Sequence, residues 1–189
     1  MAIILPKQVW TEEGELLFQE SEKVTDFNQA RKIVNSLKKT LERYGGVGLA
    51  APQIGVSQRI FVVNIIPDNN HRPNLPMIGF RAFLNPEILA VSSGINYDIE
   101  GCLSIFYGTL YGPVERGNYV KLKYLDIDGE EKIEEISHPF FTRVVLHEND
   151  HLDGKIFLQR MSSENFSKLS WDENLDIRIK MKISKHNED

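Results

Sequence analysis

The sequence has little cysteine and no long apolar run. Cys102 is the single cysteine among 189 residues, so a disulfide bond within the chain is excluded. The apolar part of Met1–Lys7 is too short for a signal peptide. No stretch approaches the roughly 20 apolar residues that a membrane-spanning helix requires. We therefore expect a cytoplasmic protein that does not enter a membrane.

Positive charge is also scarce. The chain carries 22 lysines and arginines against 27 aspartates and glutamates, a net charge of −5, which argues against broad binding to DNA or other nucleic acids. Its 41% hydrophobic and 26% charged residues are typical of globular proteins. There is no repeat or linker, so we expect one domain over residues 1–189, least clearly defined from residue 162 onward.

Residues that can bind a metal ion or act as a general base lie together in the pattern H-E-x-x-H, which begins at His147 and ends at His151. Residues four apart lie on the same face of an α-helix, so the two imidazoles can point at one metal ion. Glu148 is rotated off that line and can reach a water on the metal, as a general base must. The alternative is a polar helix end with two ordinary, partly buried histidines. The cost of burying so many polar groups favours the metal site.

The flanking residues predict a helix around this pattern. Ser137 can cap its N-terminus, and Pro139 is tolerated in the first turn. Gly154 suits a left-handed end after the last turn. The histidines would then lie near the C-terminal end of a helix.

Two imidazoles are too few for a stable catalytic metal, which usually has three protein ligands and one open position. Cys102 is open to three interpretations: a buried structural thiol, a reactive nucleophile or a metal ligand. The residues alone leave these alternatives open.

A run of small residues, Gly46–Gly55, would let the backbone approach a ligand or another element closely. It lacks the lysine of a phosphate-binding loop and the glycine spacing of a dinucleotide site, so nucleotide binding is disfavoured. Gln53 is the one polar side chain in the run. Its amide can serve a ligand or satisfy backbone groups of the loop.

Apolar periodicity predicts the remaining elements. A helical period runs from Asp26 to Gly45. We expect a loop over 68–79 and extended segments over residues 59–66, 83–89, 95–99, 119–125, 132–136 and 177–183. In the third of these segments, Ile95, Tyr97 and Ile99 alternate with polar residues, as in a half-buried strand. The predicted fold class is α+β, with mostly antiparallel strands packed around a central metal-binding helix.

Three segments together resemble the motifs of the peptide deformylase family. They are Gly46–Gln53 (GVGLAAPQ), Glu100–Ser104 (EGCLS) and His147–Leu152 (HENDHL). Their order and separation make the resemblance specific. The implied reaction is hydrolysis of the formyl group from the N-terminal formyl-methionine of newly made polypeptides, with release of formate.

The resemblance also implies a metal centre. Cys102, as a thiolate, would join His147 and His151 in holding one divalent metal ion, with Fe²⁺ as the native metal and Zn²⁺, Ni²⁺ or Co²⁺ as substitutes. Glu148 would act as the general base for the attacking water.

Other residues in and near the motifs would stabilise the intermediate, hold the ligands or contact the substrate. The Gln53 side-chain amide and the Leu103 backbone N–H would stabilise the negative oxygen of the tetrahedral intermediate. Glu100 and Asp150 would hold the ligands in place. The expected substrate contacts are the backbone of Gly48 and an apolar wall for the methionine side chain, formed by Ile99, Phe140 and Val144.

The expected partners are nascent formyl-Met peptides, with the ribosome as a further hypothesis. Some bacterial relatives are expected to reach the ribosome through a basic C-terminal helix, but residues 168–189 here hold five basic and five acidic residues. Their alternation of basic and apolar side chains indicates a strand with a solvated face, which disfavours RNA binding. We expect a monomer.

Three departures distinguish the chain from the family pattern. The loop Ile105–Gly112 is slightly longer than the usual turn, and within it Tyr111 stands where an arginine is common. Leu146 replaces the glutamine that usually precedes the first histidine. The N-terminal stretch also lacks the familiar proline-containing start. The loop borders the expected cleft, so it bears on substrate preference beyond methionine.

Two other functions remain open. A metallopeptidase would use H-E-x-x-H on internal peptide bonds, but its third ligand usually lies downstream, whereas Cys102 lies upstream. A catalytically inert relative would keep the fold and metal as a binding module. The presence of Gln53, Cys102 and Glu148 argues against that function, and the unusual loop favours it.

Overall fold

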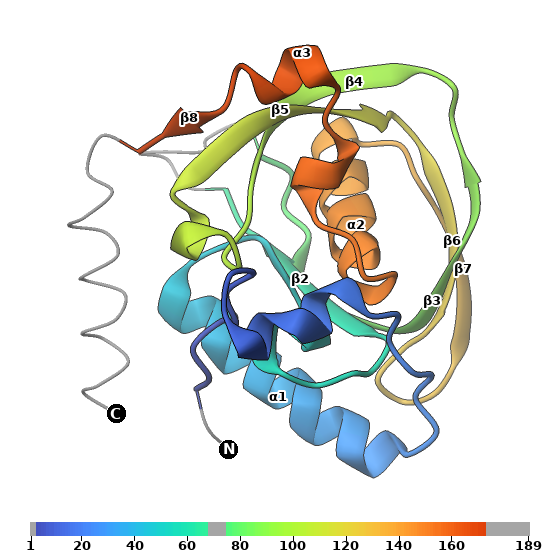
Figure 1. Ribbon diagram of the computed structural model, residues 1–189. Coiled ribbons are helices and arrows are strands. Elements are labelled where there is room, and N and C mark those ends of the chain that lie inside the picture. Colours follow the sequence, from blue (N-terminus) through green and yellow to red (C-terminus); the bar gives the residue numbers. More distant parts are fainter. Residues whose placement is uncertain (1–2, 68–74, 173–189) are drawn as a thin grey trace.

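The computed structural model describes residues 3–67 and 75–172. Two antiparallel sheets enclose a central helix, α2, and a second long helix, α1, covers the outside of the larger sheet (Figure 1). The larger sheet has the strand order β1 (Gly48–Ala50), β2 (Ile60–Ile65), β3 (Gly79–Val91), β6 (Val120–Leu125) and β7 (Glu131–Ile136). The smaller sheet has the order β4 (Ile95–Gly101), β5 (Leu110–Gly117) and β8 (Ser170–Trp171). The predicted α+β class is confirmed.

Three α-helices and four short 3₁₀ helices accompany the described strands. The α-helices are α1 (Phe27–Tyr44), α2 (Pro139–Leu152) and α3 (Ser163–Phe166). The 3₁₀ helices are η1 (Glu12–Phe18), η2 (Ala51–Ile54), η3 (Phe106–Gly108) and η4 (Phe157–Arg160). Within the described ranges, none of these helices has both the length and the apolar character needed to cross a membrane.

Helix α1 has the boundaries that its sequence predicts. The Asp26 side chain caps it by accepting hydrogen bonds from the backbone N–H groups of Asn28 and Gln29. Gly45 ends it with a φ of 73°, which favours a residue without a Cβ. The apolar face of the helix is buried against strand β2, where Leu37 belongs to the same core cluster as Val62. The predicted amphipathic helix is confirmed.

Strand β2 is buried on both faces, which explains why all of its residues except Asn64 are apolar. Phe61 and Val63 belong to the cluster that also contains Val144 and Val145 of α2. The intervening Val62 faces the α1 cluster. The larger sheet is therefore a layer between two helices, and α2 reaches it through apolar contacts.

The N-cap of helix α2 lies one residue after the predicted one. The N-cap is His138, whose side chain makes no capping hydrogen bond, so the prediction of a Ser137 cap is wrong. Pro139 occupies the first turn and favours an extended residue before it, which places the N-cap at His138. The predicted end is confirmed, since Gly154 follows the helix with a φ of 66°.

Strand β4 exists as predicted, but its apolar side chains lie on the exposed face and not on the buried one. Ile95, Tyr97 and Ile99 are 66%, 50% and 55% exposed, whereas Glu100 is 5% exposed. The alternation was therefore correct and the assignment of the buried face was wrong. The physical reason is that the inward side of β4 meets polar groups of α2, so a carboxylate occupies the buried position.

Other predictions concern the ends and the loops. The strand over 177–183 and most of the loop over 68–79 lie outside the described residues, and β3 begins at Gly79. The N-terminal stretch forms η1 and two isolated bridges, Glu20 with Asp153 and Glu22 with Gln58.

Candidate metal centre and active site

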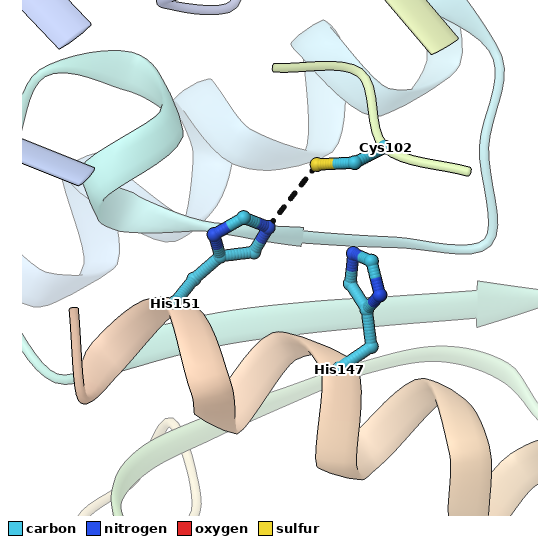
Figure 2. Close-up of side chains that lie close together, drawn as sticks. All are labelled: Cys102, His147 and His151. Atoms are coloured by element: carbon cyan, nitrogen blue, oxygen red, sulfur yellow. Dashed lines mark hydrogen bonds between the residues drawn. The ribbon is translucent and has the colours of Figure 1, made fainter. Parts of the chain in front are cut away.

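Cys102, His147 and His151 converge inside the protein. The two histidines lie one turn apart on α2, and Cys102 follows the end of β4 and faces them (Figure 2). Its Sγ lies 3.2 Å from Nε2 of His151, and ligand atoms from all three residues lie within 4.8 Å of one another. Cys102 and His151 are 3% and 1% exposed. The helical spacing supplies two of these groups, and the strand end supplies the third.

The donor set fits a divalent metal. One sulfur and two imidazole nitrogens are the ligands of a catalytic site with three protein ligands and an open position. Burial raises the pKa of the Cys102 thiol, but His151 and His147 more than offset burial and bring this pKa to about 5. The thiolate is the form that ligates metals.

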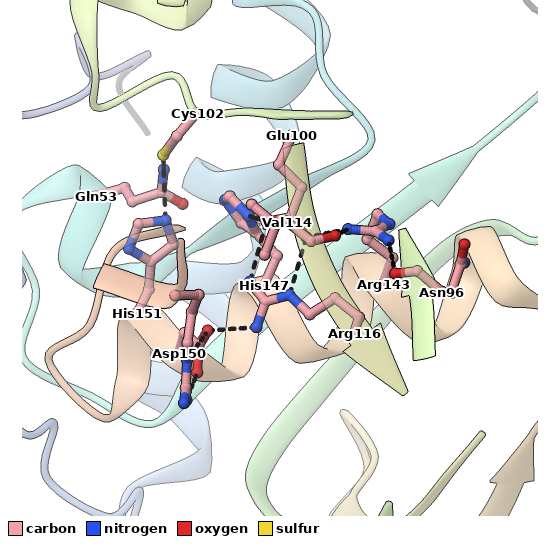
Figure 3. A network of polar contacts seen from close by, with 11 residues as sticks. Gln53, Asn96, Glu100, Cys102, Val114, Arg116, Arg143, His147, Asp150 and His151 are labelled. Carbon is pink, nitrogen blue, oxygen red and sulfur yellow. Dashed lines mark hydrogen bonds and ion pairs between the residues drawn. The ribbon is translucent and has the colours of Figure 1, made fainter. Parts of the chain in front are cut away.

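Glu100 fixes the orientation of the first histidine. Its Oε2 lies 2.8 Å from Nδ1 of His147, which leaves Nε2 of that ring for the metal (Figure 3). Arg116 donates to Glu100 through Nε and Nη2 at 2.9 and 3.0 Å, and Arg143 donates through Nη1 at 2.8 Å. Burial raises the pKa of Glu100, but its hydrogen bonds to His147 and Arg116 hold it well below its usual range. The residue is therefore a buried carboxylate.

A second carboxylate, Asp150, extends the same network. Arg116 donates to it through Nη1 at 2.5 Å (Figure 3). Arg160 of η4 donates to it through Nε at 3.0 Å. Arg143 also donates to the backbone carbonyls of Val114 and Asn96. Helix α2 thus meets the larger sheet through apolar contacts and the smaller sheet through ions and hydrogen bonds.

Gln53 reaches the centre from η2, opposite α2. Its Oε1 accepts a hydrogen bond from the Ala50 N–H at 2.8 Å. Its Nε2 lies 3.4 Å from Sγ of Cys102 and 3.2 Å from Oγ of Ser104. The backbone donor to Oε1 therefore turns the amide N–H groups toward the cysteine. Leu103 follows directly after that cysteine in the chain.

Glu148 projects from α2 toward the first strand. A Cβ added at Gly48 would lie 2.4 Å from its Oε1, so the carboxylate occupies the space that a side chain would need. Glu148 is 4% exposed, and its Oε2 has no hydrogen-bond partner within the described part of the chain. Burial raises the pKa of this carboxyl to about 7. A buried carboxylate oxygen without a partner among the described residues is typical of a group that acts on a bound molecule.

Comparison with known proteins decides the family. The family model for polypeptide deformylase matches residues 6–167. The chain belongs to the polypeptide deformylase family. It is 40% identical over 157 residues to peptide deformylase 1 of Bacillus subtilis, covering 82% of this chain and 90% of the relative. Identity to peptide deformylase 2 of Gloeobacter violaceus is 36% over 160 residues, covering 84% and 81%.

Solved structures of the family share the fold. A class I type b peptide deformylase from Acinetobacter baumannii with Met-Ala-Ser bound superposes with a TM-score of 0.76 at 34% identity, covering 85% of this chain and all of that one. The peptide deformylase of Thermotoga maritima gives 0.72 at 32% identity, covering 86% and 99%. As a member of this family the chain is an enzyme, a hydrolase.

The structure places the expected substrate contacts of this deformylase family member at three locations. Val144 is buried in the cluster between α2 and the larger sheet, and Phe140 packs on that cluster while partly exposed. Ile99 instead lies on the exposed face of β4. Gly48 lies on β1 beside Glu148.

The three arginines of the network were not identified from the sequence. One signal was available for Arg116, which shares the inward alternation of Leu110, Gly112 and Val114 on β5. A cation at an inward strand position must be paired with an acid. The identity of that acid depends on contacts between distant segments, so the sequence pattern could not supply it.

Replacing Gly48 with alanine should reveal the contact with Glu148. Gly48 has no positive φ, so the strand can accept a Cβ, and the obstacle is the glutamate side chain. We expect Gly48→Ala to lower the free energy of unfolding by about 1–3 kcal/mol through overpacking. Denaturant titration in the parent and in a Glu148→Ala background measures this effect. In that background most of the loss should vanish, and an equal loss in both would contradict the contact.

Replacing Arg116 with methionine should strongly destabilise the fold. The change removes the cation that joins Glu100 to Asp150 while both carboxylates stay buried, so we expect a loss of about 3–5 kcal/mol in the free energy of unfolding. Urea titration gives this quantity. Lys123→Met, which removes an exposed ion pair with Glu87, is the matched control and should change little. Equal effects of the two substitutions would show that the buried network does not stabilise the fold.

Proposed function

We propose that this deformylase family member removes the formyl group from the N-terminal formyl-methionine of newly made polypeptides and releases formate. The observation that carries the proposal is the convergence of Cys102, His147 and His151, with the Gln53 amide beside Cys102 and the buried Glu148 next to His147 on α2. The Acinetobacter baumannii structure with Met-Ala-Ser bound supports a peptide substrate that begins with methionine.

The three converging ligands would hold one divalent ion. We propose Fe²⁺ as the native metal, with Zn²⁺, Ni²⁺ or Co²⁺ as substitutes, because a thiolate with two imidazoles suits several of these ions. When bound, the ion supplies Lewis acidity, which lowers the pKa of a water and polarises a carbonyl oxygen. Glu100 keeps His147 oriented for this role through the bond to Nδ1.

Glu148 moves the proton. Its carboxylate accepts a proton from the water that attacks the formyl carbon, and then returns it to the departing amine nitrogen as the C–N bond breaks. The position of the side chain against Gly48 supports this role, as does its Oε2, which no described residue hydrogen-bonds. The products are formate and a peptide with a free N-terminus.

Gln53 and Leu103 would stabilise the oxyanion of the tetrahedral intermediate. The Ala50 N–H holds the Gln53 amide so that Nε2 points to the cysteine side of the site. The backbone N–H of Leu103 follows the cysteine and would be the second donor. Each such donor typically lowers the barrier by about 3 kcal/mol.

The peptide would lie between two strand edges. Strands β1 and β4 each end their sheet, so each has a hydrogen-bonded strand neighbour on one side only in the described part of the chain. An extended peptide can pair with such edges through its backbone. Gly48 would supply backbone contact, and Phe140 and Val144 would form the apolar wall near the methionine side chain, with Ile99 at the rim.

The direct test uses a formyl-Met-Ala-Ser peptide with enzyme purified without oxygen. Metal content is measured first, and formate release is then followed with an acetyl-Met-Ala-Ser control. Formate from the formyl peptide alone supports the proposal. A folded, metal-loaded protein that releases no formate would contradict it and favour the inert binding module. Cleavage of internal bonds in a longer peptide would favour a metallopeptidase.

Partners beyond the substrate are part of the same proposal. We propose a cytoplasmic monomer, and keep ribosome association as a hypothesis that concerns residues 168–189, most of which lie outside the described ranges. Sedimentation with purified ribosomes, using the full chain and a chain that ends before residue 173, tests it. Equal binding by both would exclude a role for the tail.

A further inference from the structure

The turn after the candidate metal ligand Cys102 is strained. Phe106 and Tyr107 have φ values of 44° and 53°, in the left-handed region that residues with a Cβ rarely adopt. Such strain persists only when surrounding contacts hold the backbone in place, and it often occurs near functional sites. The turn lies within Ile105–Gly112, the loop that the sequence predicts to be longer than the family pattern. Contacts that impose this conformation therefore also affect the backbone next to Cys102.

The side chain of Gln8 makes the most specific of these contacts. Its Oε1 accepts a hydrogen bond from the Tyr107 N–H at 3.1 Å. Its Nε2 donates to the carbonyl oxygens of Leu103 and Pro6, both at 2.9 Å. Gln8 is 3% exposed. Since one contact needs an acceptor and two need donors, only one orientation of the amide satisfies all three.

The backbone around Gln8 holds the same part of the site. The N–H of Lys7 donates to the Gln53 carbonyl at 2.8 Å, and the N–H of Val9 donates to the Ser104 carbonyl at 3.1 Å. Trp10 stacks on Phe106 with ring centroids 4.1 Å apart. The N-terminal segment therefore lies against the backbone that carries the two proposed oxyanion donors.

We propose that Gln8 is a positioning residue, which joins the strained turn at Tyr107 to the carbonyl of Leu103 and thereby orients the backbone N–H of Leu103 toward the substrate. The proposal rests on the proposed function, because it gives Leu103 a role only if an oxyanion forms there. Gln8 itself does not touch the reacting atoms. Loss of the Gln8 side chain should reduce the stabilisation of the transition state more than it reduces the affinity for the substrate.

The test compares Gln8→Met with Thr11→Val. Methionine keeps the length of the side chain and removes all three hydrogen bonds. The control removes one hydrogen bond, from Thr11 Oγ1 to the Gln8 carbonyl, in the same segment. We expect Gln8→Met to lower kcat for formyl-Met-Ala-Ser about 10-fold with little change in KM or metal content. The control should keep kcat within about twofold. Equal losses of kcat in both variants would overturn the proposal.

A second measurement does not depend on activity. In Zn²⁺-loaded protein, Gln8→Met should shift the amide NMR signal of Leu103 and speed the hydrogen exchange of the Tyr107 N–H, whereas Thr11→Val should do neither. Unchanged signals would overturn the positioning role even if the parent is active. An inactive parent whose signals shift as expected would instead count against the proposed function. If the methionine variant does not fold, Gln8→Glu keeps the acceptor for Tyr107, and only the Leu103 signal should then shift.

Discussion

Replacing Glu148 with glutamine should leave a folded, metal-binding protein that has lost about 100- to 10,000-fold in kcat, the usual contribution of a general base. Glutamine has the same shape but cannot accept the proton of the attacking water. The side chain is buried and its pKa is raised to about 7 by that burial, so a neutral amide is tolerated in its place. Formate release at equal metal content measures the loss.

The matched control for this substitution is Glu164→Gln. Glu164 pairs with Lys168 on the surface, so the change removes the same kind of charge from an exposed position. The activity of the Glu164→Gln variant should equal that of the parent. A Glu148→Gln variant that kept more than a tenth of the parent activity would show that another group moves the proton.

Replacing Cys102 with alanine should remove the metal and the activity together. The change leaves two imidazoles and takes away the one anionic ligand of the proposed set. Loss of a residue that only orients a ligand costs about 10- to 100-fold in metal affinity, so loss of the ligand itself should cost more than about 100-fold. Metal analysis after dialysis, together with formate release, measures both effects.

Chelation of the parent gives the comparison for the cysteine substitution. Removing the metal from the parent should abolish formate release, and adding Fe²⁺ or Ni²⁺ back should restore it. The same addition to Cys102→Ala should restore little. A variant that kept metal and activity would exclude Cys102 as a ligand and leave it a structural thiol.

The sequence determined the local part of this protein. The spacing of His147 and His151, the cap at Asp26 and the glycines at helix ends depend on residues a few positions apart, and the structure contains each of these features. The apolar residues of β2, interrupted only by Asn64, likewise predicted a buried strand. These features follow from backbone geometry and side-chain periodicity, which neighbouring residues set on their own.

Only the tertiary structure decided which distant groups meet. The apolar residues of β4 face outward because Glu100 is needed inside, where Arg116 and His147 bind it. No periodicity could reveal this, since apolar and polar alternation looks the same for either buried face. Gln8 likewise reads as an unremarkable polar residue until the fold places it between Leu103 and Tyr107. Such contacts depend on how the two sheets close around α2, and that closure is a property of the whole chain.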